Sequence, residues 1–384
     1  ADGQKLAPSG APVEWVEEPS YFFRLSAWQK PLLDFYEANP GFVLPLSRRN
    51  EVASFVKGGL QDLSVSRTSF RWGVPVPDDP AHIMYVWLDA LTNYATAVGY
   101  PDFEGNELGR FWPADLHMVG KDILRFHAVY WPAFLMAAGL PLPHTIFAHG
   151  WLLFEQDKMS KSRGNIVQPD PIREVLGTDA LRYFLLREIP FGQDGNFSFD
   201  ALLTRYNSDL ANDLGNLASR VLTMIGRYFH EEIPYPSPLA QRSHQDLHVV
   251  ETAERVMTRY CECFDRLEFS TGLEAVWELI AAVNKYLVET EPWSLAEQHN
   301  SDDRARVATT LYTAAEALRV TTFLLAPVMP EAAGKIWRQL GLTTDLSSLS
   351  LETARSSPLR PVEKIGKVEP VFPRLLKEET LRKL

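Results

Sequence analysis

The sequence contains few cysteines and no long hydrophobic run. Cys261 and Cys263 are the only cysteines among 384 residues, which excludes a disulfide framework, and a zinc site would need ligands that do not lie nearby. We therefore expect two ordinary helix thiols and no metal site. No run of 18 apolar residues occurs, so we expect no membrane-spanning helix. The N-terminus lacks the basic and apolar regions of a signal peptide.

Positive charge is also scarce. The chain has 38 Lys and Arg against 49 Asp and Glu, a net charge of −11. This balance argues against a protein that binds nucleic acid over its whole surface, because such binding requires Lys and Arg to neutralise phosphates. It still allows a local basic track. A hydrophobic content of 46% and a charged content of 23% are typical of a globular protein with room for two or three domains.

A local concentration of positive charge lies near the middle of the chain. Lys158 and Lys161 are three positions apart in Lys-Met-Ser-Lys-Ser, and Arg163 follows. The loop comes shortly after a predicted strand at 145–149, and open α/β sheets bind ligands at the carboxyl ends of their strands. Lysines there suit phosphate oxygens. For a single Lys-x-x-Lys pair the alternative is a solvated basic turn.

The patterning divides the chain into an α/β part and a helical part. Short apolar runs at 83–87, 116–120 and 145–149 each lead into a helix or loop, which predicts three parallel strands of a doubly wound sheet. From about 199 to 342 the spacing is helical throughout. It predicts an antiparallel helix bundle, with helices at roughly 199–230, 244–267, 272–298, 302–325 and 330–340. Residues 343–370 are expected to be mostly irregular, and 374–384 a final charged helix.

Several strings of residues resemble methionyl-tRNA synthetase, a class I aminoacyl-tRNA synthetase, in this order. They are YVWLDALTNY (85–94), HMVGKDILRFH (117–127), FAHG (147–150), KMSKS (158–162), GNLASR (215–220) and EPW (291–293). The resemblance covers essentially the whole chain. It implies an α/β nucleotide-binding fold, of which this chain holds the C-terminal half of the parallel sheet, followed by an all-α anticodon-binding bundle.

The resemblance also implies a division into domains. We expect the end of a connective insertion with linking helices at 1–80 and the C-terminal half of a Rossmann-like catalytic domain with the lysine loop at 81–168. A stem-contact segment follows at 169–198, the anticodon-binding bundle at 199–342, and a C-terminal extension at 343–384.

One signature of the family is missing. The family has a His-x-Gly-His turn at the start of its nucleotide fold, and none of the nine histidines here forms such a pair. We interpret the chain as a C-terminal portion whose N-terminal half is a separate or cleaved piece. We then expect the chain alone not to form methionyl-adenylate at a useful rate, and the missing half to be a partner.

The resemblance implies ATP-dependent activation of L-methionine and transfer of the methionyl group to the 3′ end of tRNA(Met). Charge then builds on the leaving pyrophosphate, so the protein supplies positioning and positive charge. Lys161 is the predicted main phosphate contact, with Lys158 assisting as the second catalytic lysine, and Mg²⁺ is expected to bridge phosphate oxygens. By resemblance the ATP-binding residues are Gly120, Asp122, His149, Gly150, Met159, Ser160, Lys161 and Ser162. Asp122 alone could equally be an acid favoured at a helix N-terminus.

The methionine side chain has its own predicted pocket. By resemblance it is lined by Trp87, Ala90, Leu91, Tyr94, Ile123 and His127. Aromatic edges suit a polarizable thioether. Without the resemblance, Trp87 and Tyr94 would be read as ordinary core residues of an α/β protein, and His127 as a structural histidine. Many relatives have Pro where Leu91 stands, so the contour of the pocket there is left open.

Three residues of the helical half are predicted to read the CAU anticodon. Asn216 and Arg220 are spaced i, i+4 and so share a helix face, and Trp293 offers a surface on which an unpaired base can stack. The alternative is that Trp293, which follows Pro292, is a packing residue at a helix start and that Arg220 is solvated.

Two other functions are weighed against a methionine–tRNA ligase. One is another class I synthetase, for leucine, isoleucine, valine or cysteine, all of which share the lysine loop. The other is a tRNA-binding fragment without catalysis. For the leading hypothesis we expect L-methionine, ATP, and initiator and elongator tRNA(Met) as partners. We also expect a monomer, because no appended oligonucleotide-binding barrel follows, and a cytoplasmic location.

Overall fold

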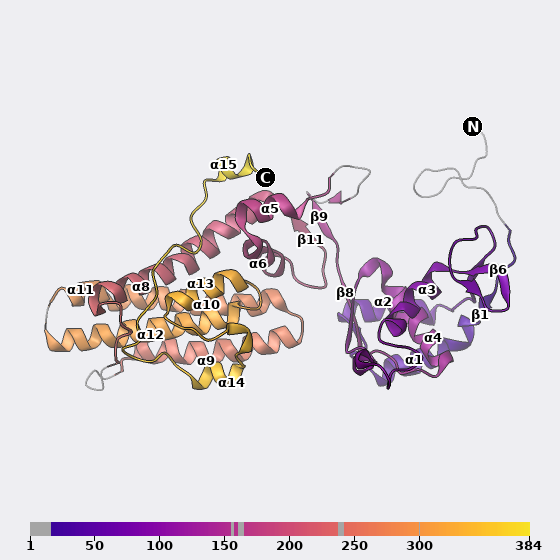
Figure 1. The fold of residues 1–384 in the computed structure, drawn as a ribbon, viewed down its shortest axis with the longest axis horizontal. Coiled ribbons are helices and arrows are strands. Elements are labelled where there is room, and N and C mark those ends of the chain that lie inside the picture. Colours follow the sequence, from indigo (N-terminus) through magenta and orange to yellow (C-terminus); the bar gives the residue numbers. More distant parts are fainter. Residues whose placement is uncertain (1–16, 155–156, 160–164, 237–241, 299) are drawn as a thin grey trace. The chain divides into compact units, whose positions relative to one another are not determined.

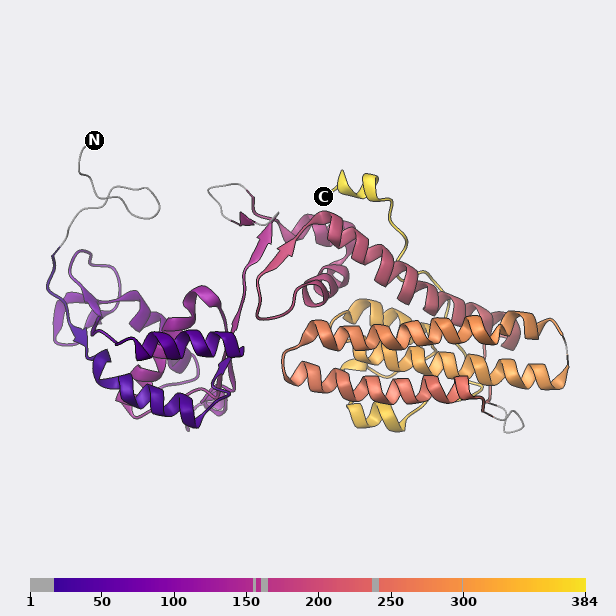
Figure 2. The same cartoon turned by 180° about the vertical axis from the view of Figure 1, so that it is seen from behind.

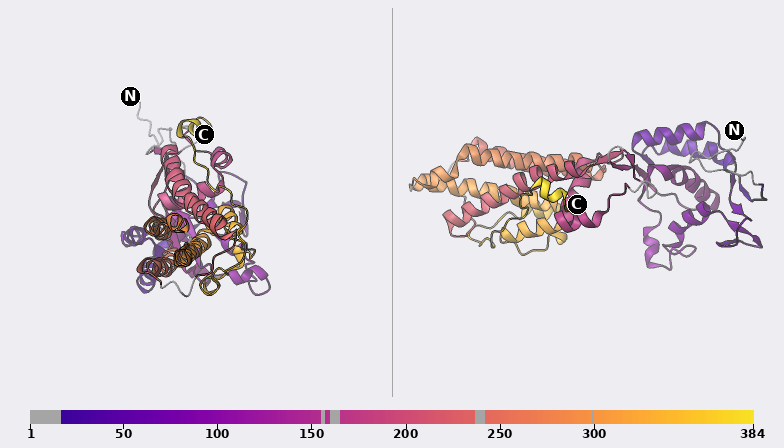
Figure 3. Two further views of the ribbon diagram at one scale, coloured as in Figure 1. Left: turned by 90° about the vertical axis from the view of Figure 1, so that its left-hand side faces the viewer. Right: turned by 90° about the horizontal axis from the view of Figure 1, so that it is seen from above.

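The chain forms two compact units in a computed structural model that describes residues 17–154, 157–159, 165–236, 242–298 and 300–384. The first unit comprises residues 1–150 and the second residues 151–384. Each unit has its own hydrophobic core. Figure 1 labels the elements, Figure 2 shows them from behind, and Figure 3 gives two further views.

The first unit mixes short strands with helices. Its strands are β1 (Phe22–Phe23), β2 (Val43–Leu44), β3 (Leu63–Ser64), β4 (Ser66–Arg67), β5 (Pro75–Val76), β6 (Asp79–Met84), β7 (Leu116–Gly120) and β8 (Thr145–His149). Its α-helices are α1 (Gln29–Ala38), α2 (Leu46–Lys57), α3 (Val86–Thr96) and α4 (Trp131–Ala138). The short helical turns are η1 (Leu25–Trp28), η2 (Glu107–Phe111), η3 (Lys121–Ile123) and the π-helical η4 (Phe126–Tyr130).

A parallel sheet of three strands, in the order β2-β8-β7, positions the residues predicted to bind ATP at 120–122 and 149–150. The strands β7 and β8 were predicted. The prediction of a third parallel strand at 83–87 is wrong, because β6 pairs with β4 and β5 in a separate antiparallel sheet and the helix α3 already begins at Val86. A turn at Asp78, with φ of 64°, reverses the chain between β5 and β6. Asp tolerates this left-handed conformation, so the hairpin excludes β6 from the parallel sheet.

Helices cover the parallel sheet and form the main core of the first unit. Val119 on β7 and Ile146 and Ala148 on β8 are buried together with side chains of α1 and α2. The alternation along β7, where Leu116 and Met118 are exposed while His117 and Val119 are buried, is that of a strand with one covered face. The strand therefore directs His117 into the protein.

The second unit begins with strands and continues as helices. Its strands are β9 (Leu152–Phe154), β10 (Asp157–Lys158) and β11 (Gly195–Phe197). Its helices are α5 (Pro169–Leu176), α6 (Thr178–Glu188), α7 (Phe199–Arg205), the π-helical η6 (Tyr206–Gly215), α8 (Asn216–Phe229), α9 (His244–Asp265), α10 (Phe269–Thr290), α11 (Pro292–Ala296), α12 (Ser301–Leu325), α13 (Pro330–Gln339), η7 (Leu346–Ser348), α14 (Leu351–Ser356) and α15 (Lys377–Leu381).

The long helices α9, α10 and α12 pack against one another and form the predicted bundle, which Figure 2 shows from behind. The predicted helix at 199–230 is a continuous helical run whose middle, η6, is wound as a π-helix. Residues 343–370 are mostly irregular, as expected, with the short helices η7 and α14. The final helix, expected at 374–384, is only Lys377–Leu381.

A buried polar cluster around Asp246 connects three helices of the bundle. The carboxylate of Asp246 at the start of α9 accepts hydrogen bonds from Tyr286 of α10, from Arg306 of α12 at 2.7 Å and from the backbone N–H of Ser243 at 2.7 Å. Burial alone would raise the pKa of Asp246, but these hydrogen bonds hold it below its ordinary value.

No helix within the described ranges has both the length and the apolar character needed to cross a membrane.

Candidate functional site

Helix α3 presents the predicted methionine-pocket residues at helical spacing. Trp87, Leu91 and Tyr94 recur at i, i+4 and i+7 and therefore lie on one side of the helix. Leu91 is buried in the same core cluster against which Trp87 and Tyr94 pack. Ala90, in contrast, lies exposed. The structure thus brings three of the four predicted residues of α3 to one packed face.

Trp87 is held by an aromatic neighbour from another element. Its ring stacks on Phe126 of η4 with centroids 3.6 Å apart and planes 11° from parallel. Both side chains are half-buried, so the stack keeps some accessible surface. Stacked pairs of this kind fix the orientation of both rings.

Tyr94, His127 and Ile123 form a chain of hydrogen bonds. The hydroxyl of Tyr94 lies 2.8 Å from His127 Nε2, and His127 Nδ1 lies 2.9 Å from the carbonyl oxygen of Ile123. A carbonyl can only accept, so Nδ1 carries the hydrogen and Nε2 of the neutral ring accepts from Tyr94. Burial lowers the pKa of His127, opposed in part by the bond to Ile123. His127 is therefore an uncharged, polar side chain of the candidate site.

A second buried histidine stands beside this chain. His117 on β7 is 6% exposed, and its ring meets that of Tyr94 edge-on at 4.3 Å and lies 6.2 Å from that of His127. Burial, and secondarily His127, lower the pKa of His117 to about 4. Among the described residues no group accepts from or donates to its Nε2. The pair keeps the site uncharged at neutral pH.

The predicted adenosine residues meet at the carboxyl ends of β7 and β8. Gly120 is the register partner of His149. A Cβ built on Gly120 would lie 2.8 Å from Asp122 Oδ1 and 3.8 Å from His149 Cε1. A side chain at position 120 would therefore have to displace the Asp122 carboxylate. His149 Nδ1–H donates to the carbonyl of Gly150 at 2.8 Å, which fixes the direction of the imidazole ring.

The lysine loop is described only at its edges. Lys158 belongs to β10, which pairs antiparallel with β9, and Met159 packs against the core of the second unit. The predicted phosphate-binding residues Ser160, Lys161 and Ser162 lie outside the described residues. Within the described ranges no group of three or more His, Cys, Asp or Glu side chains could hold a metal ion.

Two of the three predicted anticodon residues are in contact. The guanidinium carbon of Arg220 on α8 lies 5.6 Å from the ring centroid of Trp293 on α11, a cation–π arrangement. Trp293 is half-buried, so part of its ring is free to meet a ligand. Asn216 lies exposed one turn before Arg220 on the same helix. The three form a polar and aromatic surface at the α8–α11 side of the bundle.

Two family models match the chain. Residues 5–222 match tRNA synthetases class I (M), and residues 237–380 match the anticodon-binding domain of methionyl tRNA ligase. The chain belongs to the methionyl-tRNA synthetase family.

Individual members of the methionyl-tRNA synthetase family agree with this. The methionine–tRNA ligase of Mycobacterium tuberculosis is 52% identical over 358 residues, which cover 93% of this chain and 68% of the relative. That of Brucella suis is 48% identical over 379 residues, or 99% of this chain and 72% of the relative. The solved structure of M. tuberculosis methionyl-tRNA synthetase in complex with methionyl-adenylate matches with a TM-score of 0.91 and 51% identity, over 97% of this chain and 72% of that chain.

These matches confirm the predicted methionyl-tRNA synthetase family and its order of a class I α/β domain followed by a helical anticodon-binding domain. They favour methionine over leucine, isoleucine, valine or cysteine. They give no support to the interpretation of the chain as an inactive portion lacking half its site, since the synthetase match already begins at residue 5. The roles of single residues and the domain boundaries stay predictions.

The structure adds residues to the candidate methionine site that had no predicted role. Phe126 stacks on Trp87, and His117 closes the group around Tyr94. Both lie in the string 117–127, and the strand alternation on β7 was a signal that His117 faces inward. No comparable signal marked Phe126, because its partner depends on how η4 crosses α3.

Proposed function

We propose that this chain activates L-methionine with ATP and transfers it to tRNA(Met). A carboxylate oxygen of methionine attacks the α-phosphorus of ATP, and pyrophosphate leaves. A ribose hydroxyl at the 3′ end of the tRNA then attacks the carbonyl carbon of the adenylate, and AMP leaves with the bonding electrons. The observation that carries the proposal is the match, at 51% identity, to a synthetase solved with methionyl-adenylate.

The methionine side chain would be held by the group around Trp87 and Tyr94. The stacked pair of Trp87 and Phe126 offers aromatic surface to the thioether. Neutral His127 leaves no charge to be desolvated against that sulfur, since its Nε2 is engaged by the Tyr94 hydroxyl. Leu91, buried in the same cluster, would give apolar backing, while Ile123 fixes His127 through its carbonyl. Exposed Ala90 would act only if the ligand reaches that side of α3.

Adenosine would bind where β7 and β8 end. Gly120 permits close approach of the nucleoside, because even a methyl group there would press on Asp122. The Asp122 carboxylate would accept from ribose hydroxyls, and His149 and Gly150 would lie on the adenine side. Strand pairing supports this placement, since it aligns Gly120 with His149.

The polyphosphate would be stabilised by the lysine loop. Lys161 would neutralise the departing pyrophosphate with help from Lys158, and Ser160, Ser162 and Met159 would complete the loop around ATP. Mg²⁺ suits this chemistry because ATP itself offers the phosphate oxygens that the ion prefers, so no cage of acidic side chains is needed. The ion would supply further positive charge to the phosphates.

The bundle would select the tRNA. Trp293, with Arg220 over its ring, would stack on an unpaired anticodon base, and Asn216 would hydrogen-bond to a base edge. Initiator and elongator tRNA(Met) share the CAU anticodon and would be bound alike. We place the reaction in the cytoplasm, where aminoacyl-tRNA is consumed, and expect a monomer.

The test is amino-acid-dependent ATP–pyrophosphate exchange by the chain, run in parallel with methionine, cysteine and leucine. We expect exchange with methionine, and exchange with cysteine or leucine alone would overturn the proposal. The alternative function is a tRNA-binding module without catalysis. The observation that favours it is the anticodon surface. This alternative predicts binding of a CAU stem-loop with no exchange by the chain. The same result would bear out the predicted inactivity of the chain without a further polypeptide.

A further inference from the structure

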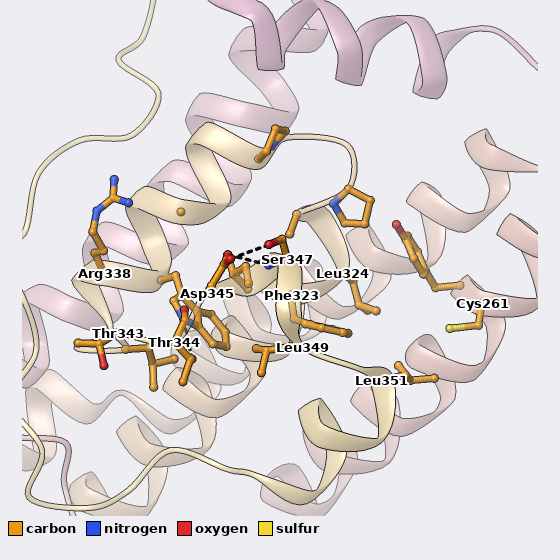
Figure 4. A pocket seen from close by; sticks show the side chains of 18 residues that line it. Cys261, Phe323, Leu324, Arg338, Thr343, Thr344, Asp345, Ser347, Leu349 and Leu351 are labelled. Atoms are coloured by element: carbon orange, nitrogen blue, oxygen red, sulfur yellow. Dashed lines mark hydrogen bonds between the residues drawn. The ribbon is translucent and has the colours of Figure 1, made fainter. Parts of the chain in front are cut away.

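A cavity of about 880 Å³ lies in the second unit, and none of its lining residues is given a role above (Figure 4). It is bounded by the C-terminal part of α9, by the end of α12, by α13 and by residues 342–351. Its lining is mainly apolar and includes Phe323, Leu324, Trp337, Leu342, Leu349 and Leu351. This size and composition are those of small-molecule sites, which commonly measure about 300–1,000 Å³.

The wall formed by residues 342–351 is held in place by hydrogen bonds. Trp337 Nε1 donates to the carbonyl oxygen of Thr344 at 3.0 Å. The carboxylate of Asp345 accepts from the backbone N–H of Ser347 at 3.0 Å and from its hydroxyl at 2.7 Å, the bonds drawn in Figure 4. Since Trp337 is itself buried, the segment is anchored to α13. The cavity is therefore built by fixed elements.

One residue that lines the cavity has a buried hydroxyl without a hydrogen-bond partner among the described residues. Tyr260 is 6% exposed and lines the cavity, and among the described residues nothing hydrogen-bonds to its hydroxyl. Its ring stacks on Phe264 with centroids 4.0 Å apart, which limits rotation of the side chain. Burial raises the pKa of Tyr260 well above its ordinary value, so the group is a donor at all physiological pH values. A buried hydroxyl without an acceptor destabilises the folded state.

We propose that this cavity is a binding site for a small apolar molecule with an aromatic or branched aliphatic body and one hydrogen-bond acceptor. The body would fill the space lined by Phe323, Leu324 and Leu349, and the acceptor would reach the buried Tyr260 hydroxyl after the atoms that cover it move aside. The site is separate from the residues proposed for methionine, ATP and tRNA. Its occupancy therefore does not depend on the proposed ligase function.

The chain offers a matched pair of glycines for a test. Gly334 on α13 lines the cavity, and a Cβ there would meet only Arg338 Nη1, at 3.4 Å. Gly226 in the middle of α8 has nothing within 4 Å of such a Cβ and does not line the cavity. Gly334→Phe should fill the cavity, while Gly226→Phe makes the same change elsewhere in the same unit.

The probe is 1-anilinonaphthalene-8-sulfonate, whose rings match the apolar walls and whose sulfonate is an acceptor. We expect a saturable fluorescence rise with the full-length chain, at least a tenfold weaker affinity in Gly334→Phe, and no change in Gly226→Phe. Tyr260→Phe should weaken binding by about two- to tenfold, since a hydrogen bond contributes about 0.5–1.5 kcal/mol. Equal affinity in wild type and Gly334→Phe would overturn the proposal.

A second measurement does not depend on whether Gly334→Phe folds. The half-buried Cys261 lines the cavity while Cys263 is 2% exposed, so alkylation of the wild-type chain by iodoacetamide reports mainly on Cys261. In Figure 4 Cys261 stands on the opposite side of the cavity from Thr343 and Thr344. Saturating probe should slow this alkylation at least fivefold. An unchanged rate would show that the probe binds elsewhere and would refute the site.

Discussion

Acidification should lower the stability of the first unit, because the unfolded chain binds a proton on His117 more readily than the folded one. The unfolded chain binds a proton on this histidine near pH 6.5, whereas burial and the neighbouring His127 lower the pKa in the folded unit to about 4. Between these values the unfolded state binds more protons than the folded state, so stability rises with pH and is lost as the pH falls. The perturbation is a change from pH 7.5 to pH 5, combined with the substitution His117→Phe.

The expected magnitude follows from the two pKa values. At pH 5 the unfolded histidine is almost fully protonated and the folded one is about nine-tenths neutral, which corresponds to a loss of about 2 kcal/mol relative to pH 7.5. His127 shifts in the same direction and adds to the loss. In His117→Phe the contribution of residue 117 to this loss of stability disappears, because phenylalanine has no titrating nitrogen. Its ring keeps the edge contact with Tyr94.

The assay is hydrogen exchange with mass spectrometry, read on peptides that cover β7 and α4. The chain has two compact units, so a single unfolding curve would not isolate the first one. After correction for intrinsic exchange rates, the free energy of opening of the wild-type unit should fall by about 2 kcal/mol or more from pH 7.5 to pH 5. In His117→Phe the fall should be smaller by about 2 kcal/mol. His144→Gln, at an exposed histidine of the same unit, is the control. An equal loss in wild type and His117→Phe would refute the reasoning.

Three further predictions concern other parts of the chain. Lys161→Ala should lower methionine-dependent pyrophosphate exchange at least a hundredfold while the affinity for methionine, measured by calorimetry, changes little, because the lysine acts mainly on charge that develops in the transition state. Trp293→Ala should weaken binding of a CAU anticodon stem-loop by about 1–3 kcal/mol through lost stacking, with fluorescence anisotropy as the measurement. Asp246→Asn should destabilise the bundle by about 3 kcal/mol, because the charge of Arg306 loses its partner; the readout is exchange protection of α9, and full protection would contradict the assigned role.

The sequence allowed the helical half to be predicted more closely than the α/β half. The long helices α9 and α12 lie within a few residues of their predicted bounds, since each buries a continuous stripe against neighbours close in sequence. The helix predicted at 272–298 is instead two helices, α10 and α11, because the chain turns at Glu291. The strands are two to six residues long. For such short runs the pattern cannot distinguish a parallel strand from one arm of a hairpin. That choice depends on the turn at Asp78 and on the pairing of β2 with β8, a contact between segments about 100 residues apart.

The candidate methionine site shows a second limit of sequence patterns. Phe126 and His127 are adjacent in the chain, yet Phe126 stacks on Trp87 and His127 bonds to Tyr94, and these partners lie seven residues apart on α3, about 10.5 Å along the helix axis. The segment η4 buries His127, Ala128 and Val129 in succession. The wider π-helical winding turns successive side chains through smaller angles and so lets neighbouring residues share one face. Which residues of this segment pack against α3 therefore depends on the local winding of the helix, which apolar periodicity in the sequence does not predict.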